Sequence, residues 1–239
     1  MASTYSSDLK LEIVATGEKA GLWGTITNTN LQILEQSASG YIEIDMAGAS
    51  VTLDLTDGAT SNGKNFYLKL SGTLAGDRTL TMPSGSERVF IISDETVRGT
   101  SNRTLSVLTA SGTAQPVPPG ASLLCVSDGT NTTTRIIEKG YATITDSNSP
   151  YTAVAGAQIF ANTTANPITI TLPASPAVGD EVSIIDTRGT FGSNNVIVDR
   201  NGQPINTGTS NLTLTTNGQS ITLVYVDSTR GWAYKTNTA

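Results

Sequence analysis

The stretch Arg78–Asp94, RTLTMPSGSERVFIISD, decides the fold because its pattern occurs twice in the chain. Ile168–Asp186, ITITLPASPAVGDEVSIID, follows the same plan: alternating apolar and polar residues, a proline, a turn, and an apolar strand that contains Ile-Ile. Alternation with a period of two places successive side chains on opposite faces of a β-strand. Each copy therefore predicts two short strands joined by a turn.

Two further features follow in the same order in both copies. Asn102–Val107 corresponds to Ser193–Val198, and the glycine-led apolar strand Gly120–Asp128 corresponds to Gly218–Asp227. Four features in one order, at similar spacing, indicate an internal duplication. We therefore expect a mainly β protein with two tandem β-sandwich or jelly-roll-like modules. One continuous barrel across both copies is the alternative.

The duplication suggests where the domains begin and end. Residues 41–138 hold the first expected module and residues 153–239 the second. Residues 139–152 are polar, contain Pro150, and are the expected linker. Residues 1–40 differ from both modules, and we expect them to form an N-terminal attachment segment with a short helix.

The attachment segment is expected to contain one strand and one helix. Leu9–Val14 alternates apolar and polar residues, which indicates a short strand. Thr29 and Gln32 have the spacing of a capping box, and Gly40 is a typical helix stop, so the helix is expected between them. A helix this short is unstable alone in water and must dock on another surface.

The large apolar side chains of this segment are the expected attachment residues. A segment this small cannot build its own core, so these side chains need a surface on neighbouring subunits or on another protein of the assembly. The alternative is that the segment packs on the first module of its own chain. The residues concerned are Leu22, Trp23, Leu31, Ile33 and Leu34.

Composition excludes several classes of function. The net charge is −6 and the 14 basic residues are scattered singly, which argues against nucleic-acid binding. No apolar run is long enough for a transmembrane helix, so membrane insertion is not expected. The chain has no histidine and a single cysteine, Cys125, in an apolar strand. Histidine-dependent triads, histidine metal sites and intrachain disulfides are therefore excluded.

Acidic residues at strand ends are the remaining candidates for catalysis, because glycan-cleaving enzymes use carboxylate pairs. A catalytic pair should be unique, whereas these residues occupy related places in both copies, so solvation of strand ends and turn capping explain them better. We expect no catalytic residues, no cofactor and no metal, since the Asp-Gly and Asn-Gly turns lack the ligand spacing of a calcium loop. The carboxylates concerned are Glu87, Asp94, Glu95, Asp180, Glu181 and Asp186.

Aromatic residues cluster near the C-terminus, where Tyr225–Tyr234 indicates a hairpin. Packing in the core or across the hairpin is the favoured role of Tyr225, Trp232 and Tyr234. Contact with a receptor glycan is the second role considered for the same three residues.

Three stretches resemble one class of protein. Ser7–Leu31 resembles the N-terminal motif of many tailed-phage virion proteins, mostly fibre-like and common in phages of cyanobacteria and other marine bacteria. Val51–Leu74 resembles their shaft modules, and Thr222–Tyr234 resembles their C-terminal ending. The resemblance implies a homotrimer located in the virion and attached to other virion proteins through its N-terminus.

We therefore expect a non-enzymatic virion structural protein, a short trimeric tail fibre that contributes to host adsorption by contact with a host surface glycan. A decoration or head-fibre protein on the capsid surface is the first alternative. A carbohydrate-binding adhesin or a glycan depolymerase is the second. The chain is short for a fibre that reaches a host alone and lacks a recognisable chaperone or lyase domain, which favours a short fibre or a surface decoration.

Overall fold

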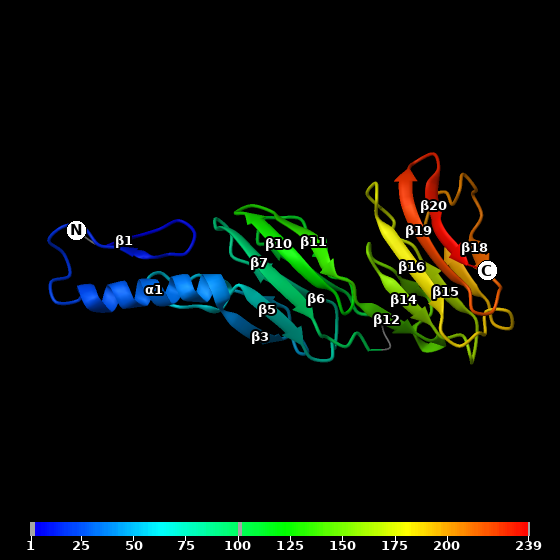
Figure 1. Cartoon of the computed structure of the whole chain (residues 1–239), viewed down its shortest axis with the longest axis horizontal. Helices are drawn as coiled ribbons and strands as arrows, with labels where there is room; N and C mark the ends of the chain where they lie inside the picture. The colour runs from blue at the N-terminus through cyan, green and yellow to red at the C-terminus, as the bar shows by residue number, and fades with distance from the viewer. Residues whose placement is uncertain (1–2, 100–101, 239) are drawn as a thin grey trace. The chain divides into compact units, whose positions relative to one another are not determined.

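A computed structural model describes residues 3–99 and 102–238, and contacts within the chain divide it into two compact units (Figure 1). The first unit contains most of the chain up to Ile137. The second contains the chain from Glu138 onwards, together with the short segments Arg98–Arg103 and Pro118–Ala121.

The first unit starts with a hairpin and a helix, followed by two sheets. The hairpin is β1 (Thr4–Tyr5) and β2 (Glu12–Ile13), the helix is α1 (Trp23–Ser39), and η1 (Asn62–Lys64) is a single 3₁₀ turn. One sheet has the order β11-β10-β7-β5-β3, with β3 Tyr41–Asp45, β5 Tyr67–Ser71, β7 Glu87–Asp94, β10 Ser122–Asp128 and β11 Thr132–Glu138. The other has the order β4-β6-β8-β9, with β4 Val51–Thr52, β6 Arg78–Met82, β8 Leu105–Thr109 and β9 Gln115–Pro116.

The second unit repeats this topology strand for strand. Its five-stranded sheet has the order β12-β14-β16-β19-β20, with β12 Tyr141–Ile144, β14 Gln158–Ala161, β16 Glu181–Asp186, β19 Ser220–Asp227 and β20 Gly231–Thr238. Its four-stranded sheet has the order β13-β15-β17-β18, with β13 Tyr151–Thr152, β15 Ile168–Thr171, β17 Val196–Asp199 and β18 Leu212–Leu214, and η2 spans Asp146–Asn148. Strands matched by the sequence repeat occupy the same places in their units, so the repeat corresponds to a repeated fold.

Parallel pairing between successive turns defines the architecture. In the first unit β3, β5 and β7 pair in parallel in one sheet, while β4, β6 and β8 pair in parallel in the other. The chain therefore alternates between two sheets and advances by one strand in each at every turn. Strands β9 and β10 then pair antiparallel with β8 and β7 and end the winding. This is a β-solenoid, with about six turns in the whole chain.

The expected tandem β-sandwich or jelly-roll modules are therefore wrong. Those folds are built from antiparallel strands, whereas in each four- or five-stranded sheet here the first three strands along the chain are parallel. The alternating pattern predicts strands in both architectures, because it indicates which face of a strand is buried and not which strand lies beside it.

The core consists of rows of apolar side chains that stack from turn to turn. In the first unit Leu68, Ile92 and Leu123 are cross-strand neighbours, and each is at most 1% exposed. In the second unit Ile159 and Ile184 form the corresponding row with a buried neighbour on β19. Burying such side chains stabilises the fold by about 1.5–3 kcal/mol each.

Helix α1 differs from its expected extent. It begins at Trp23, and Thr29 lies inside it, where the Oγ1 of Thr29 donates a hydrogen bond to the carbonyl of Thr25 at 3.0 Å. The capping box at Thr29 is therefore wrong, while Gly40 does end the helix. No helix within residues 3–99 and 102–238 is long and apolar enough to cross a membrane.

Asp186, at the end of β16, accepts hydrogen bonds from two loops of the second unit. Its carboxylate accepts backbone N–H bonds from Arg188 (3.1 Å), Gly189 (2.9 Å), Phe191 (3.1 Å) and Gly218 (3.0 Å). Burial alone would raise the pKa of Asp186, but the backbone donors outweigh it and hold that pKa below its ordinary value.

Replacing Asp186 should destabilise the second unit. Asp186→Asn removes the charge and turns an NH₂ group toward backbone donors, which should lower the free energy of unfolding by about 3 kcal/mol. Urea unfolding followed by fluorescence of the buried Trp232 measures the loss. Asp227→Asn is the matched control, because Asp227 accepts two backbone N–H bonds in an exposed turn and should cost less. Equal losses in the two variants would contradict this role of Asp186.

Asp186 also makes stability depend on pH. Because its pKa is lower in the folded chain than in the unfolded chain, its contribution is fully present above about pH 4 and is lost as the pH falls through the folded-state pKa. The difference in unfolding free energy between the wild type and Asp186→Asn should be largest near neutral pH and should shrink below about pH 4. Urea unfolding over this pH range measures it, and a constant difference would contradict the assignment.

Candidate functional site

Helix α1 exposes most of the predicted attachment residues. Leu22, Trp23, Leu31 and Leu34 are 50%, 53%, 58% and 43% exposed, whereas Ile33 is fully buried. The structure therefore places four of the five on the surface of the first unit. Ile33 belongs to the packing of the helix on its own chain.

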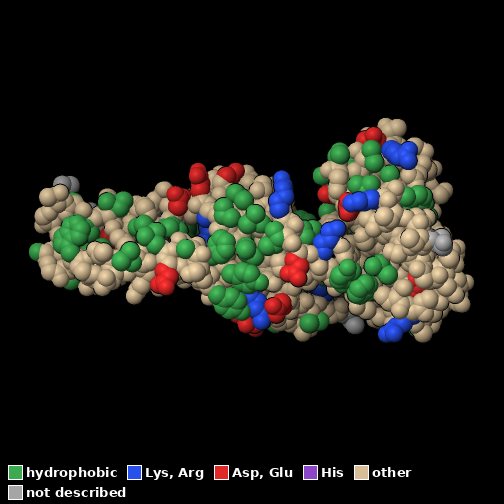
Figure 2. Space-filling view, in the orientation of Figure 1, with side chains coloured by type: hydrophobic (Ala, Val, Ile, Leu, Met, Phe, Trp, Pro, Cys, Tyr) green, Lys and Arg blue, Asp and Glu red, His purple; other side chains and the backbone are tan. Residues whose placement is uncertain are grey.

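The exposed side chains form a stripe beside the buried face of the helix. Trp23, Leu31 and Leu34 lie on one side of α1. Exposed Thr27 and Ala38 lie on the same side, because these five positions follow one another at intervals of three or four residues. Figure 2 shows hydrophobic side chains along this part of the molecule. An exposed apolar stripe on a helix is typical of a surface that packs against a partner.

Asn30 fastens the buried face of α1 to the N-terminal hairpin. Its Oδ1 accepts a hydrogen bond from the backbone N–H of Glu12, and its Nδ2 donates to the carbonyl of Glu12, both at 3.0 Å. Ile26 and Ile33 lie on the same face and are buried. The salt bridge between Lys19 and Glu12, at 3.2 Å, holds the connecting loop to the same strand.

The C-terminal end of α1 is held by the loop before β5. The side chain of Gln36 donates to the carbonyl of Ser61 at 3.1 Å and accepts from the N–H of Ser61 at 3.3 Å. Lys64 is fully buried beneath this loop, where its Nζ donates to the carbonyls of Thr56, at 2.6 Å, and Ala59. Burial of the Lys64 ammonium lowers its pKa. Hydrogen bonds within the chain therefore hold both this loop and the end of the helix in place.

Gly40 joins α1 to β3 with no linker. A Cβ at this position would lie 2.3 Å from the carbonyl oxygen of Gln36 and 2.7 Å from Oδ1 of Asn65, so only glycine fits. The N–H of Gly40 donates to Gln36, and the carbonyl of Gly40 accepts from the N–H groups of Phe66 and Tyr67. The helix therefore continues directly into the first strand of the sheet.

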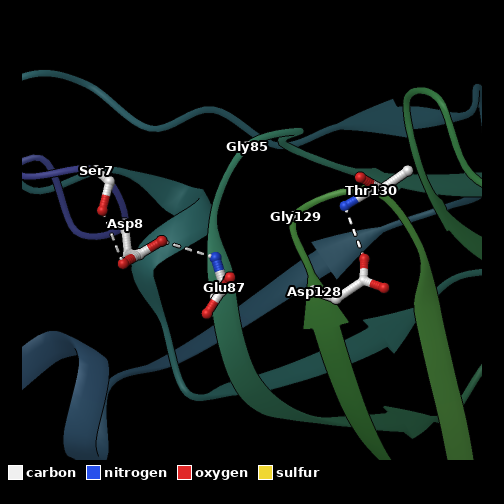
Figure 3. Close-up of a pocket in the computed structure, with 7 residues that line it drawn as sticks. All are labelled: Ser7, Asp8, Gly85, Glu87, Asp128, Gly129 and Thr130. Carbon is white, nitrogen blue, oxygen red and sulfur yellow. Dashed lines mark hydrogen bonds between the residues drawn. The ribbon is translucent and has the colours of Figure 1, made fainter.

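A shallow cleft lies where the N-terminal segment meets the first sheet (Figure 3). Oδ1 of Asp8 accepts the N–H of Glu87 at 2.8 Å, and the carbonyl of Asp8 accepts the Ser86 hydroxyl at 3.1 Å. Across the cleft, Oδ1 of Asp128 accepts the N–H groups of Thr130 and Asn131 at 2.8 and 2.6 Å. Both carboxylates thus serve as acceptors for backbone groups. The lining residues are Ser7, Asp8, Gly85, Glu87, Asp128, Gly129 and Thr130.

Asp128 is poorly suited to act as the general acid of glycan cleavage. Glu87 and Asp128 are cross-strand neighbours, so a predicted carboxylate lies beside a second one in this cleft. The N–H groups of Asn131 and Thr130 lower the pKa of Asp128, whereas a general acid needs a raised pKa. Within residues 3–99 and 102–238, no group of three or more His, Cys, Asp or Glu side chains is placed to hold a metal ion.

The other carboxylates considered for catalysis have partners that fix local structure. Two of them form salt bridges, in which Glu95 lies 3.0 Å from Lys69 and Glu181 contacts Lys139 and Lys235. The remaining three accept hydrogen bonds in turns. These are Asp94, Asp180 and Asp186.

The C-terminal aromatic cluster divides between core and surface. Trp232 is fully buried and Tyr225 nearly so, and their rings meet edge to face with centroids 5.6 Å apart. The Tyr225 hydroxyl donates to Oε1 of Gln203 at 3.0 Å. Tyr234 alone of the three is well exposed, at 43%. A glycan contact at this cluster would therefore depend on Tyr234.

Cys125 lies in the core of the first sheet, fully buried opposite Phe90. Burial raises the pKa of its thiol to about 12, so the group stays protonated and weakly nucleophilic at neutral pH.

Asn30, Gln36 and Lys64 were not predicted from the sequence as parts of the site. Each bonds to backbone groups that lie 5 to 25 positions away, and no local pattern marks such partners. Asn30 and Gln36 have one signal, the position of a polar residue beside an apolar helix face, and Lys64 has none.

Removing the Asn30 side chain should loosen the hairpin without unfolding the sheets. Asn30→Ala deletes both hydrogen bonds to Glu12, so hydrogen exchange of the Glu12 amide should accelerate about tenfold while the urea midpoint stays nearly unchanged. Asn28→Ala is the matched control, because Asn28 is an exposed asparagine of the same helix. Equal exchange rates in the two variants would show that Asn30 does not hold the hairpin.

Comparisons with known proteins place the chain in no family. No protein-family model matches the sequence, and no curated protein matches it. A solved structure described as "Structure of a chaperone-substrate complex" is 13% identical, covers 82% of this chain and has a TM-score of 0.36. The chain spans about a third of the length of that protein (32%), and so low a TM-score supports no conclusion about fold or function.

Proposed function

We propose that this chain is a non-enzymatic structural subunit of a tailed-phage particle, a short tail fibre that attaches through the exposed apolar stripe of α1. The stripe is the observation that carries the proposal: Trp23, Leu31 and Leu34 face solvent on a helix that Asn30 and Gln36 hold rigidly to its own unit. Leaving such side chains in water gives up hydrophobic stabilisation, which a partner would recover.

Two further observations support the proposal. The stretch Ser7–Leu31, which resembles the N-terminal motif of fibre-like virion proteins, contains β2 of the hairpin and the first half of this helix. The carboxylates examined for catalysis have structural partners, which favours a structural role over glycan cleavage. A decoration protein on the capsid surface would use the same attachment helix. Imaging particles that carry a label on this chain distinguishes tail from head.

Removing Trp23 should weaken attachment while leaving both units folded. Burial of a tryptophan contributes about 2–3 kcal/mol, so Trp23→Ala should lower the copy number on particles at least tenfold when protein is limiting. Quantitative mass spectrometry of purified particles measures this copy number, and urea unfolding checks the fold.

Tyr234→Ala is the matched control, because Tyr234 is also an exposed aromatic residue but lies in the second unit. It should leave the copy number unchanged. Normal incorporation of Trp23→Ala, or equal losses in both variants, would reject attachment through α1.

A further inference from the structure

Five pairs of residues in the chain place glycine directly after asparagine or aspartate. In such a pair the backbone nitrogen of the glycine can attack the side-chain carbonyl carbon of the residue before it, because glycine has no side chain to block the approach. Asparagine reacts faster than aspartate, because a carboxylate is ionised at neutral pH and is a poor target for a nucleophile. The five pairs are Asp57-Gly58, Asn62-Gly63, Asp128-Gly129, Asn201-Gly202 and Asn217-Gly218.

In four of the five pairs a hydrogen bond holds the nitrogen of the glycine. A nitrogen that donates its proton to an acceptor must break that bond before it can attack, which slows the reaction. The donors and acceptors are Gly58 N–H to the Lys10 carbonyl (2.8 Å), Gly63 N–H to the Asp54 carbonyl (3.1 Å), Gly129 N–H to Oγ of Ser127 (3.1 Å) and Gly218 N–H to Oδ2 of Asp186 (3.0 Å).

Gly202 is the exception. Among the residues that the structure describes, none accepts a hydrogen bond from the N–H of Gly202. Its side of the turn is open, because Gly202 is exposed and a Cβ built on it would meet no atom within 4 Å. The attacking nitrogen of this pair therefore has no hydrogen bond to break, and water reaches it directly.

Asn201 and Gly202 occupy the two central positions of a tight turn after β17. Both have positive φ, 48° and 87°, and the N–H of Gln203 donates to the carbonyl of Arg200 at 3.0 Å across the turn. The side chain of Asn201 fastens this turn to the end of β15, because its Nδ2 donates to the carbonyl of Leu172 at 2.8 Å.

We propose that Asn201-Gly202 is a site of spontaneous deamidation in the folded chain, and that the hydrogen bonds of the other four pairs protect them. The nitrogen of Gly202 bonds to Cγ of Asn201 while the bond from Cγ to Nδ2 breaks, and ammonia leaves with the proton of the glycine amide. Water then opens the cyclic imide at either carbonyl, which gives aspartate or isoaspartate in place of Asn201. The inference is independent of the proposed function, because the reaction needs no partner.

Deamidation would change how this turn is held. It removes the hydrogen bond from Nδ2 of Asn201 to Leu172 and places a carboxylate near the carbonyl that accepted it. Asp199, whose Oδ1 accepts the N–H of Asn201 at 2.9 Å, already brings one negative charge to the same turn. Like charges this close repel each other, so the turn should open.

The other pairs of the same chain serve as internal controls. The purified full-length chain is kept at mildly alkaline pH, and peptide mass spectrometry follows the replacement of NH₂ by OH at each asparagine over time. Asn201 should react about tenfold faster than Asn62 or Asn217, because at those two sites a hydrogen bond of the glycine nitrogen must break first. Isoaspartate should form from Asn201 before any forms at Asp57 or Asp128.

Unfolding the same chain in urea shows whether the structure causes the difference. Without the hydrogen bonds of the folded chain, the three Asn-Gly pairs should react at similar rates. The inference is overturned if Asn62 or Asn217 reacts as fast as Asn201 in the folded chain, or if Asn201 reacts only in urea. An equal lead of Asn201 in both conditions would overturn it as well, because local sequence and not the fold would then select the site.

Asn201→Asp tests the effect on the turn, because it supplies the charge of the product. The Gln203 amide, which closes the turn, should exchange hydrogen about tenfold faster than in the wild type. Asn195→Asp is the matched control, since it adds the same charge to the second unit at an asparagine whose side chain has no hydrogen-bond partner among the described residues. Equal exchange at Gln203 in the two variants would contradict the opening of the turn.

Discussion

Backbone hydrogen bonds between parallel strands of successive turns set which side chains of the solenoid point inward and which point outward. Tyr41–Asp45 pairs residue for residue with Tyr67–Ser71, and β7 continues the same register. A shift of one residue would move the row of Leu68, Ile92 and Leu123 from the core to solvent. The inward and outward rows of this sheet therefore depend on the register of β3, β5 and β7.

The duplication separates what the fold requires from what it permits. The central rows that point into the core are apolar in both units, as Ile92 and Ile184 illustrate. Rows that point outward differ, because Ile91 corresponds to Ser183 and Val89 to Glu181. Packing constrains the inner rows equally in the two copies. The outer rows are less constrained by packing, so their residues can differ between the two copies.

Much of the local structure could be predicted from the sequence, but little of its arrangement. Alternation located the strands, the repeat located equivalent strands, and Gly40 marked the end of α1. Strand pairing could not be predicted from the sequence. Parallel neighbours such as Tyr41 and Tyr67 are separated by a full turn of the chain, and alternation does not indicate which strands pair. Rows of cross-strand neighbours can be assigned only when that register is known. The start of α1 was missed because Leu22 caps it without a side-chain hydrogen bond.

The direct junction at Gly40 has a consequence for orientation. If a flexible linker joined the helix to the sheet, binding at the helix would fix the position of the first unit but not its orientation. Here the helix passes into β3 through one residue, and Gln36 holds the turn to Ser61. A partner that binds α1 therefore fixes the orientation of the sheet as well as the position of the first unit.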